Sequence, residues 1–228
     1  MSSRKGWLIA LAIIVLIPAT VSAHNVSKQD ASFVQSNDGP AIVPFMYLGA
    51  KHMVTGYDHL AFLVGVIFFL YRMKDIVLYV SLFTIGHSVT LLAGVLGGIH
   101  ANPYVIDAII GFSVVYKAFD NMGGFRTLFG FEPNNKLAVL IFGLFHGFGL
   151  ATKLQELDLA RNGLVTNIVS FNVGVEIGQV LALTAVLIAL SIWRTRTGFL
   201  RYAFATNTVL MAVGFMLVGY QIAGYVQP

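Results

Sequence analysis

Histidine and aspartate side chains stand at the start of an apolar stretch in the first third of the chain. His52, Asp58 and His59 form a His-x5-Asp-His pattern, and the apolar run Leu60–Leu70 follows directly. Imidazole and carboxylate groups can bind a metal ion or move a proton. Because ionisable side chains are unfavourable inside a bilayer, such a cluster beside a hydrophobic run indicates a functional site.

Polar groups recur in four later apolar stretches. His87 lies in the middle of 76–98, His146 in the middle of 136–152, and Asp107 near the start of 103–118. In the stretch 164–193, three polar residues at i, i+4 and i+7 are expected to share one helical face; they are Asn172, Glu176 and Gln179. We predict metal ligation by His52, Asp58, His59, His87, His146 and Glu176, with Asn172, Gln179 and Asp107 in support.

Helix geometry limits how these ligands can combine. Seven residues of straight helix would separate His52 from His59 by about 10 Å, too far for both to bind one ion at about 2 Å. Either the chain breaks at Gly56, as glycine permits, or the two histidines are successive binding positions. We expect Asp58 and His59 near the outer face, and the remaining ligands deeper, so that the set forms an inward path.

Each residue alone also has a purely structural interpretation. A lone intramembrane histidine, such as His87 or His146, commonly bonds to a neighbouring helix. Glu176 could be a protonated residue bonded to Asn172, and Asp107 could be solvated at the interface. His100 stands in a loop, where water would surround it. Together, several histidines and carboxylates on different helices favour a site over these alternatives.

The available ligand types narrow the choice of ion. The chain has no cysteine, which excludes disulfides and thiolate ligation. Imidazole combined with carboxylate suits Ni²⁺, Zn²⁺, Co²⁺ or Cu²⁺ better than Ca²⁺ or Mg²⁺. We therefore expect a divalent transition metal as the bound ion.

Composition defines the class of protein that must position these groups. Of 228 residues, 57% are hydrophobic and 11% charged, with a mean hydropathy of +0.80. These values predict an all-α, polytopic membrane helix bundle with the lipid bilayer as its surroundings. The formal charge of +4 does not indicate nucleic-acid binding, because the basic residues cluster in short loops.

The chain divides into three segments. Residues 1–23 have the positive start, apolar centre and Val21-Ser22-Ala23 exit of a signal peptide, although an uncleaved anchor helix is the alternative. Residues 24–40 are polar, lack helical periodicity and predict an extracytoplasmic tail. If cleavage follows Ala23, His24 becomes the N-terminus, where amine and imidazole could chelate copper; chance exposure is the simpler explanation.

Residues 41–228 then form the transmembrane domain. Its six apolar stretches are 57–72, 76–98, 103–118, 136–152, 164–193 and 202–225, and the first could extend back through 41–56. Six crossings place both mature termini outside. The loops then assigned inside carry eight basic residues against four outside, as expected for an inner (plasma) membrane protein of a bacterium.

Several short motifs resemble the HupE/UreJ family of small membrane proteins. The His52-x5-Asp58-His59 pattern matches the family's first signature. Gly86-His87-Ser88, His146-Gly147-Phe148-Gly149 and Phe171–Gln179 are similar to blocks of its second branch. The nickel permeases of the family carry Phe-His-Gly-x-Ala-x-Glu, and here Gly149 and Ala151 replace the alanine and the glutamate. The resemblance covers residues 45–222 and implies nickel transport linked to hydrogenase and urease maturation.

Three functional hypotheses follow. The first is a secondary permease for a divalent transition metal, with nickel as the expected cargo and no enzymatic activity. The second is a zinc-dependent intramembrane hydrolase, with Glu176 or Asp58 as general base. The third is a non-transporting metal-binding or assembly subunit, with a homo-oligomer or a larger membrane complex as its partner.

Overall fold

The computed structural model describes residues 28–156 and 161–227, and this part of the chain is helical without strands. The predicted all-α class is therefore confirmed. The predicted signal peptide and His24 lie outside the described residues. The helices are α2 (Lys28–Ser36), α3 (Ile42–Thr55), α4 (Tyr57–Ile67), α5 (Met73–Gly97), α6 (Pro103–Asn121), α7 (Gly124–Phe129), α8 (Asn135–Gln155), α9 (Leu164–Arg194) and α10 (Phe199–Val226).

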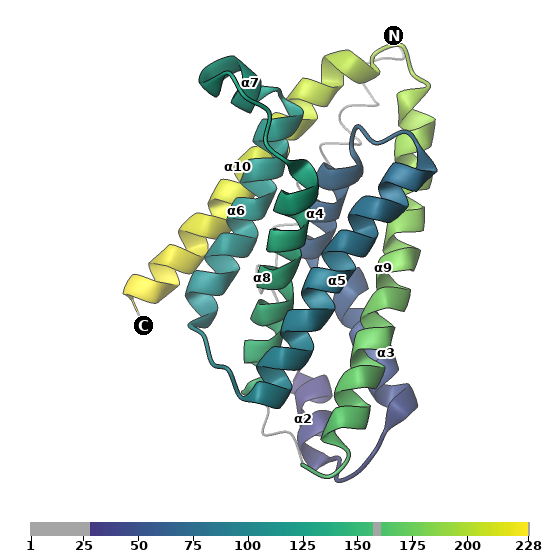
Figure 1. Cartoon of the computed structure of the whole chain (residues 1–228), viewed down its shortest axis with the longest axis vertical. Coiled ribbons are helices and arrows are strands. Elements are labelled where there is room, and N and C mark those ends of the chain that lie inside the picture. The colour runs from purple at the N-terminus through teal and green to yellow at the C-terminus, as the bar shows by residue number, and fades with distance from the viewer. Residues whose placement is uncertain (1–27, 157–160, 228) are drawn as a thin grey trace.

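The long helices run up and down in one elongated bundle (Figure 1). The connections α4–α5 and α9–α10 lie at one end, together with α7, whereas α5 ends and α9 begins at the other. Helices α3 and α4 follow each other in the same direction, so together they traverse the bundle once. Within the described residues, α5, α8, α9 and α10 are long and apolar enough to cross a membrane, and α4 is a shorter apolar helix. The count of six crossings stays a prediction.

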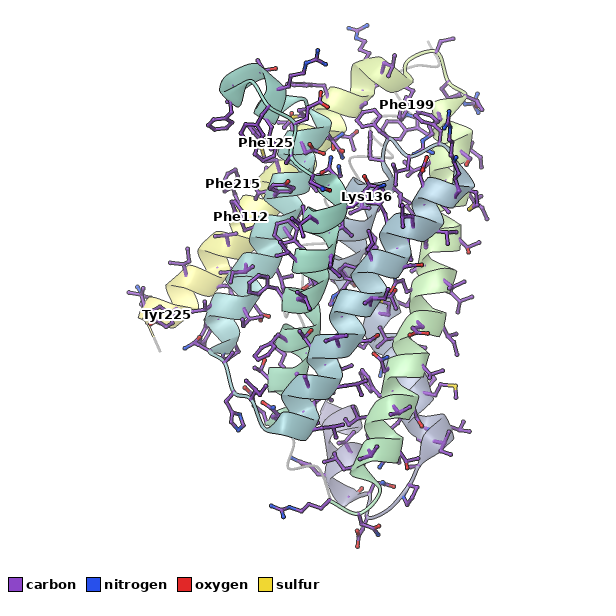
Figure 2. All side chains as sticks on the ribbon, viewed as in Figure 1. Phe112, Phe125, Lys136, Phe199, Phe215 and Tyr225 are labelled. Carbon is purple, nitrogen blue, oxygen red and sulfur yellow. The ribbon has the colours of Figure 1, made fainter. Side chains whose placement is uncertain are left out.

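The outer surface of the bundle is apolar. Large side chains such as Phe112 and Phe215 project outward and are 50% and 56% exposed (Figure 2). In a bilayer these side chains contact lipid, and hydrophobic burial against water no longer drives the helices together. Close packing and interhelical hydrogen bonds must hold the bundle.

Glycines allow that close packing. On α5 and α8, a Cβ added at Gly86 would lie 2.6 Å from the Leu140 carbonyl oxygen, and one at Gly143 would lie 2.5 Å from the Phe83 carbonyl oxygen. A Cβ at Gly147 would collide with the carbonyl oxygen of His87. Small residues at such positions let two backbones approach directly. The α5–α8 contact therefore fixes His87 on one helix close to the turn of α8 that carries His146.

The predicted alternative of a break at Gly56 is confirmed. Helix α3 ends at Thr55 and α4 begins at Tyr57, with Gly56 extended at φ −74° and ψ 92°. A Cβ on Gly56 would lie 3.0 Å from the His52 carbonyl oxygen and 3.3 Å from Nδ1 of His59. The close approach of these atoms, rather than an unusual φ, favours glycine here.

The polar segment before α3 contains a short helix, α2 (Lys28–Ser36), although its sequence has no helical periodicity. The prediction that residues 24–40 form an extracytoplasmic tail stays a prediction. Val34 on this helix is buried, and Phe33 lies 6.4 Å from Phe45 of α3, ring centroid to ring centroid. Two apolar residues in a polar segment are enough to dock one short helix against the bundle.

Candidate metal site

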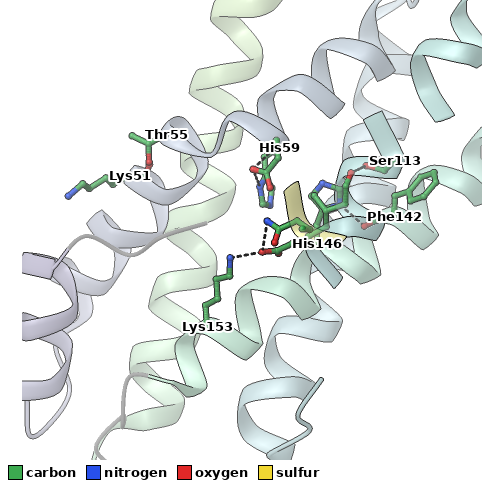
Figure 3. A network of polar contacts seen from close by, with 11 residues as sticks. Lys51, Thr55, His59, Ser113, Phe142, His146 and Lys153 are labelled. Carbon is green, nitrogen blue, oxygen red and sulfur yellow. Dashed lines mark hydrogen bonds and ion pairs between the residues drawn. The ribbon is translucent and has the colours of Figure 1, made fainter. Parts of the chain in front are cut away.

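Four histidines from four helices converge around the ring of His59. The His59 ring centroid lies 5.4 Å from that of His52 (α3), 5.8 Å from that of His87 (α5) and 4.7 Å from that of His146 (α8). His59, His87 and His146 are at most 2% exposed, and His52 is half-buried. Figure 3 shows His59 and His146 turned toward the same region between the helices.

These spacings suit rings that share an ion. Two imidazoles bound tetrahedrally to one ion at about 2.0–2.1 Å have ring centroids about 5 Å apart. The three pairs that include His59 lie close to that value. Among the described residues, no group of three His, Asp or Glu side chains is already arranged to hold an ion. The geometry therefore fits binding by pairs that have His59 in common.

The His59 ring lies beside the rings of His87 and His146, although we placed Asp58 and His59 nearer the outer face than those two residues. Their depth in the membrane stays a prediction. The bend at Gly56 permits this contact, because it changes the direction of the chain between α3 and α4. His59 thus belongs to the centre of the cluster.

Hydrogen bonds at Nδ1 set the protonation of two of the rings. His146 Nδ1 lies 2.7 Å from the Phe142 carbonyl oxygen, and His59 Nδ1 lies 3.2 Å from Asp58 Oδ1. A carbonyl or carboxylate oxygen only accepts, so Nδ1 is the donor in each case. A neutral imidazole then carries its lone pair on Nε2, which is the atom that binds metals in such carboxylate- or carbonyl-oriented histidines.

Asp58 is held by the start of α4. Its Oδ1 accepts from the backbone N–H of His59 at 2.9 Å, and its side chain is 3% exposed. A carboxylate in the first turn of a helix is favoured by the helix dipole. Asp58 therefore orients the His59 ring, as carboxylates that hydrogen-bond to metal-binding histidines do.

Phenylalanines enclose the cluster. Phe83 lies 5.1 Å from His146 and 6.2 Å from His59, and Phe62 lies 5.2 Å from His146, all between ring centroids. Both phenylalanines are essentially inaccessible to solvent. Such a shell limits water at the imidazoles. Sequence reasoning treated the aromatic residues as general core and lipid-facing groups, and nothing in their spacing singled out these two.

Two of the predicted supporting residues bond to the helix that carries His87. Asn172 Nδ2 donates to Ser88 Oγ at 2.9 Å, and Thr84 Oγ1 donates to Gln179 Oε1 at 3.1 Å. Asn172 and Gln179 are both buried. They connect α9 to α5 at the residue after His87 and at the residue three positions before it, and these two hydrogen bonds fix the position of that histidine.

Glu176 does not share their face. It is exposed on the outside of α9, beside Val173, Ile177 and Val180. The expectation that all three polar residues of α9 line one inward face is therefore wrong. At about 100° per residue, Glu176 is displaced by about 40° from Asn172 in the direction away from the buried Val175 and Gly178, so it lies beyond the edge of the buried face.

Asp107 has a partner that sequence reasoning did not identify. Its Oδ2 accepts from Lys153 Nζ at 2.8 Å and lies 3.4 Å from Gln221 Nε2 (Figure 3 draws the lysine contact). These residues come from α6, α8 and α10. Lys153 was counted only among the outside charges. The signal that could have found it is its spacing of seven residues from His146, which puts both on one face of α8.

Fold and site together define a polytopic membrane protein with a buried histidine cluster at its centre. The chain belongs to the HupE/UreJ family, whose model (HupE / UreJ protein) matches residues 28–228. That family is associated with nickel or cobalt transport and with urease or hydrogenase maturation. Neither a curated protein nor a solved structure matches the chain.

Proposed function

We propose that this protein is a secondary permease for a divalent transition metal ion, with Ni²⁺ as the expected cargo. The observation that carries the proposal is the convergence of three buried or half-buried rings on His59. Nitrogen ligands in an apolar surrounding favour Ni²⁺, Co²⁺, Zn²⁺ or Cu²⁺. Family membership supports transport of nickel or cobalt in particular.

Pairwise contacts suit transport better than permanent binding. An ion held by His52 and His59 can exchange one ligand for His146 or His87 while remaining bound to His59. Each exchange needs only a local movement of ligands, because His59 takes part in all three contacts. A transport site must bind tightly enough to admit an ion and weakly enough to release it.

The membrane itself would supply the driving force. This chain contains no phosphate-binding loop of the Gly-x4-Gly-Lys-Ser/Thr type. A divalent ion moving inward gains about 4.6 kcal/mol per 100 mV of membrane potential, twice the value for a single charge. We infer an orientation in the inner membrane with the mature termini outside. We also infer that the membrane potential directs uptake inward.

The test is metal uptake into proteoliposomes or cells. His59→Ala should reduce Ni²⁺ uptake at least about tenfold, since the mutation removes the ligand common to all three pairs. His100→Ala is the matched control, because His100 is an exposed loop residue. Unchanged uptake by His59→Ala would contradict the proposal, as would a resident zinc ion that does not exchange and accompanies hydrolytic activity.

A further inference from the structure

The ion pair between Asp107 and Lys153 is buried between two helices. The two side chains are 6% and 13% exposed, and their charged atoms are 2.8 Å apart. A buried ion pair adds little net stability, since desolvation of both charges offsets most of their attraction. A pair of this kind between α6 and α8, beside a site for cations, therefore calls for a reason other than stability.

The carboxylate of Asp107 lies against the same face of α8 that carries His146. A Cβ added at Gly149 would lie 3.5 Å from Asp107 Oδ1. Gly149 follows His146 by three residues, or about 4.5 Å along the helix axis. The carboxylate thus lies beside Gly149, about one helical turn from His146 and between His146 and Lys153 along α8. It is placed on the side of the cluster where α6 begins and α8 ends.

Lys153 supplies a cation to this carboxylate from within the chain. Its ammonium group is a single charge on a flexible four-carbon stem. A divalent ion at the same distance attracts a carboxylate twice as strongly as an ammonium group does. A metal ion that reaches Asp107 can therefore replace the ammonium group, which then swings away on its stem.

We propose that Asp107 is a second cation-binding position next to the histidine cluster, and that Lys153 occupies it until the transported ion displaces the ammonium group. The lysine then acts as a tethered competitor that weakens metal binding and speeds release. Gln221, 3.4 Å from the same carboxylate oxygen, keeps a neutral donor on Asp107 in either state. This inference rests on the proposed function, because it needs a metal ion to move through the bundle.

A second buried lysine offers a matched control. Lys117 Nζ lies 2.5 Å from Asp120 Oδ2, and both residues belong to α6, three positions apart. This pair lies toward the opposite end of α6 from Asp107. Lys117→Gln therefore removes one positive charge from the membrane domain, as Lys153→Gln does, but leaves the ion pair of Asp107 with Lys153 in place.

The experiment measures the concentration dependence of ⁶³Ni²⁺ uptake by purified protein in liposomes. Lys153→Gln should lower the KM about tenfold or more and also lower the maximal rate, because the ion now lacks a competitor for Asp107. Asp107→Asn should raise the KM about tenfold, and Lys117→Gln should leave the KM within about twofold. Asp107→Asn combined with Lys153→Met should resemble Asp107→Asn, since the lysine acts only through the carboxylate.

The results separate the two proposals. A wild-type protein that takes up no divalent metal overturns the proposed function. Wild-type uptake with an unchanged KM in Lys153→Gln overturns only the displacement by Lys153. Should Lys153→Gln fold poorly, the doubly neutral variant decides: wild-type kinetics there would show that the ion pair merely joins two helices.

Discussion

The imidazole rings of His59 and His146 lie 4.7 Å apart, between centroids, on helices α4 and α8. Each ring has its Nδ1 bonded to an acceptor, Asp58 in one case and the Phe142 carbonyl oxygen in the other. With the proton on Nδ1, the lone pair of each neutral ring is on Nε2, the atom through which such histidines bind metals. This pair is the core of the proposed ion site.

Removing the carboxylate that orients His59 should weaken metal binding without abolishing transport. Asp58→Asn keeps the shape of the side chain but removes its charge, so the basicity of the His59 ring falls. Such outer partners typically contribute about 10–100-fold to metal affinity. We expect the KM for Ni²⁺ to rise in that range while the maximal rate changes little. A loss of maximal rate with an unchanged KM would instead make Asp58 part of the transport step.

Glu176 should be dispensable for transport. Its side chain is exposed on the outside of α9, whereas the histidines lie inside the bundle. We expect Glu176→Gln to take up Ni²⁺ within about twofold of the wild type, as is usual for changes away from a site. Uptake reduced as strongly as in His59→Ala would place Glu176 on the ion path and contradict its position here.

The orientation of α9 can be tested by cross-linking, because the natural chain has no cysteine. Ser88 and Asn172 are hydrogen-bonded at 2.9 Å, so cysteines at both positions should join through a short thiol-reactive linker. The control pair combines Ser88→Cys with Glu176→Cys, which faces away from the bundle. Equal cross-linking of the two pairs, measured by mass after unfolding, would show that α9 is rotated from the orientation described.

Close packing of α5 against α8 should make Gly147 intolerant of even one methyl group. A Cβ there collides with the His87 carbonyl oxygen, so the helices must move apart. We expect Gly147→Ala to destabilise the protein by about 1–3 kcal/mol, as overpacking does. Gly219→Ala is the matched control on α10, where nothing lies within 4 Å of the added atom. Thermal unfolding in detergent micelles, followed by circular dichroism, would measure both changes.

The break between α3 and α4 shows how far sequence reasoning reaches. Seven residues of straight helix would keep His52 and His59 too far apart to bind one ion, and Gly56 marked the one place where a break was favoured. The alternative, in which the two histidines are successive binding positions, could be excluded only by knowing the direction that α4 takes after Gly56. That direction depends on packing around Gly56, where an added Cβ would lie 3.0 Å from the His52 carbonyl oxygen and 3.3 Å from His59 Nδ1.

The sequence by itself determined the membrane class, the approximate ranges of the long apolar helices and the identities of the polar groups, because hydrophobic runs and unfavourable intramembrane charges are local signals. Only the tertiary structure decided which of them meet. It brought His52, His59, His87 and His146 together, turned Glu176 outward and paired Asp107 with Lys153. The physical reason is that helix rotation and depth are fixed by glycine contacts and hydrogen bonds between helices far apart in sequence, which no periodicity within one helix can specify.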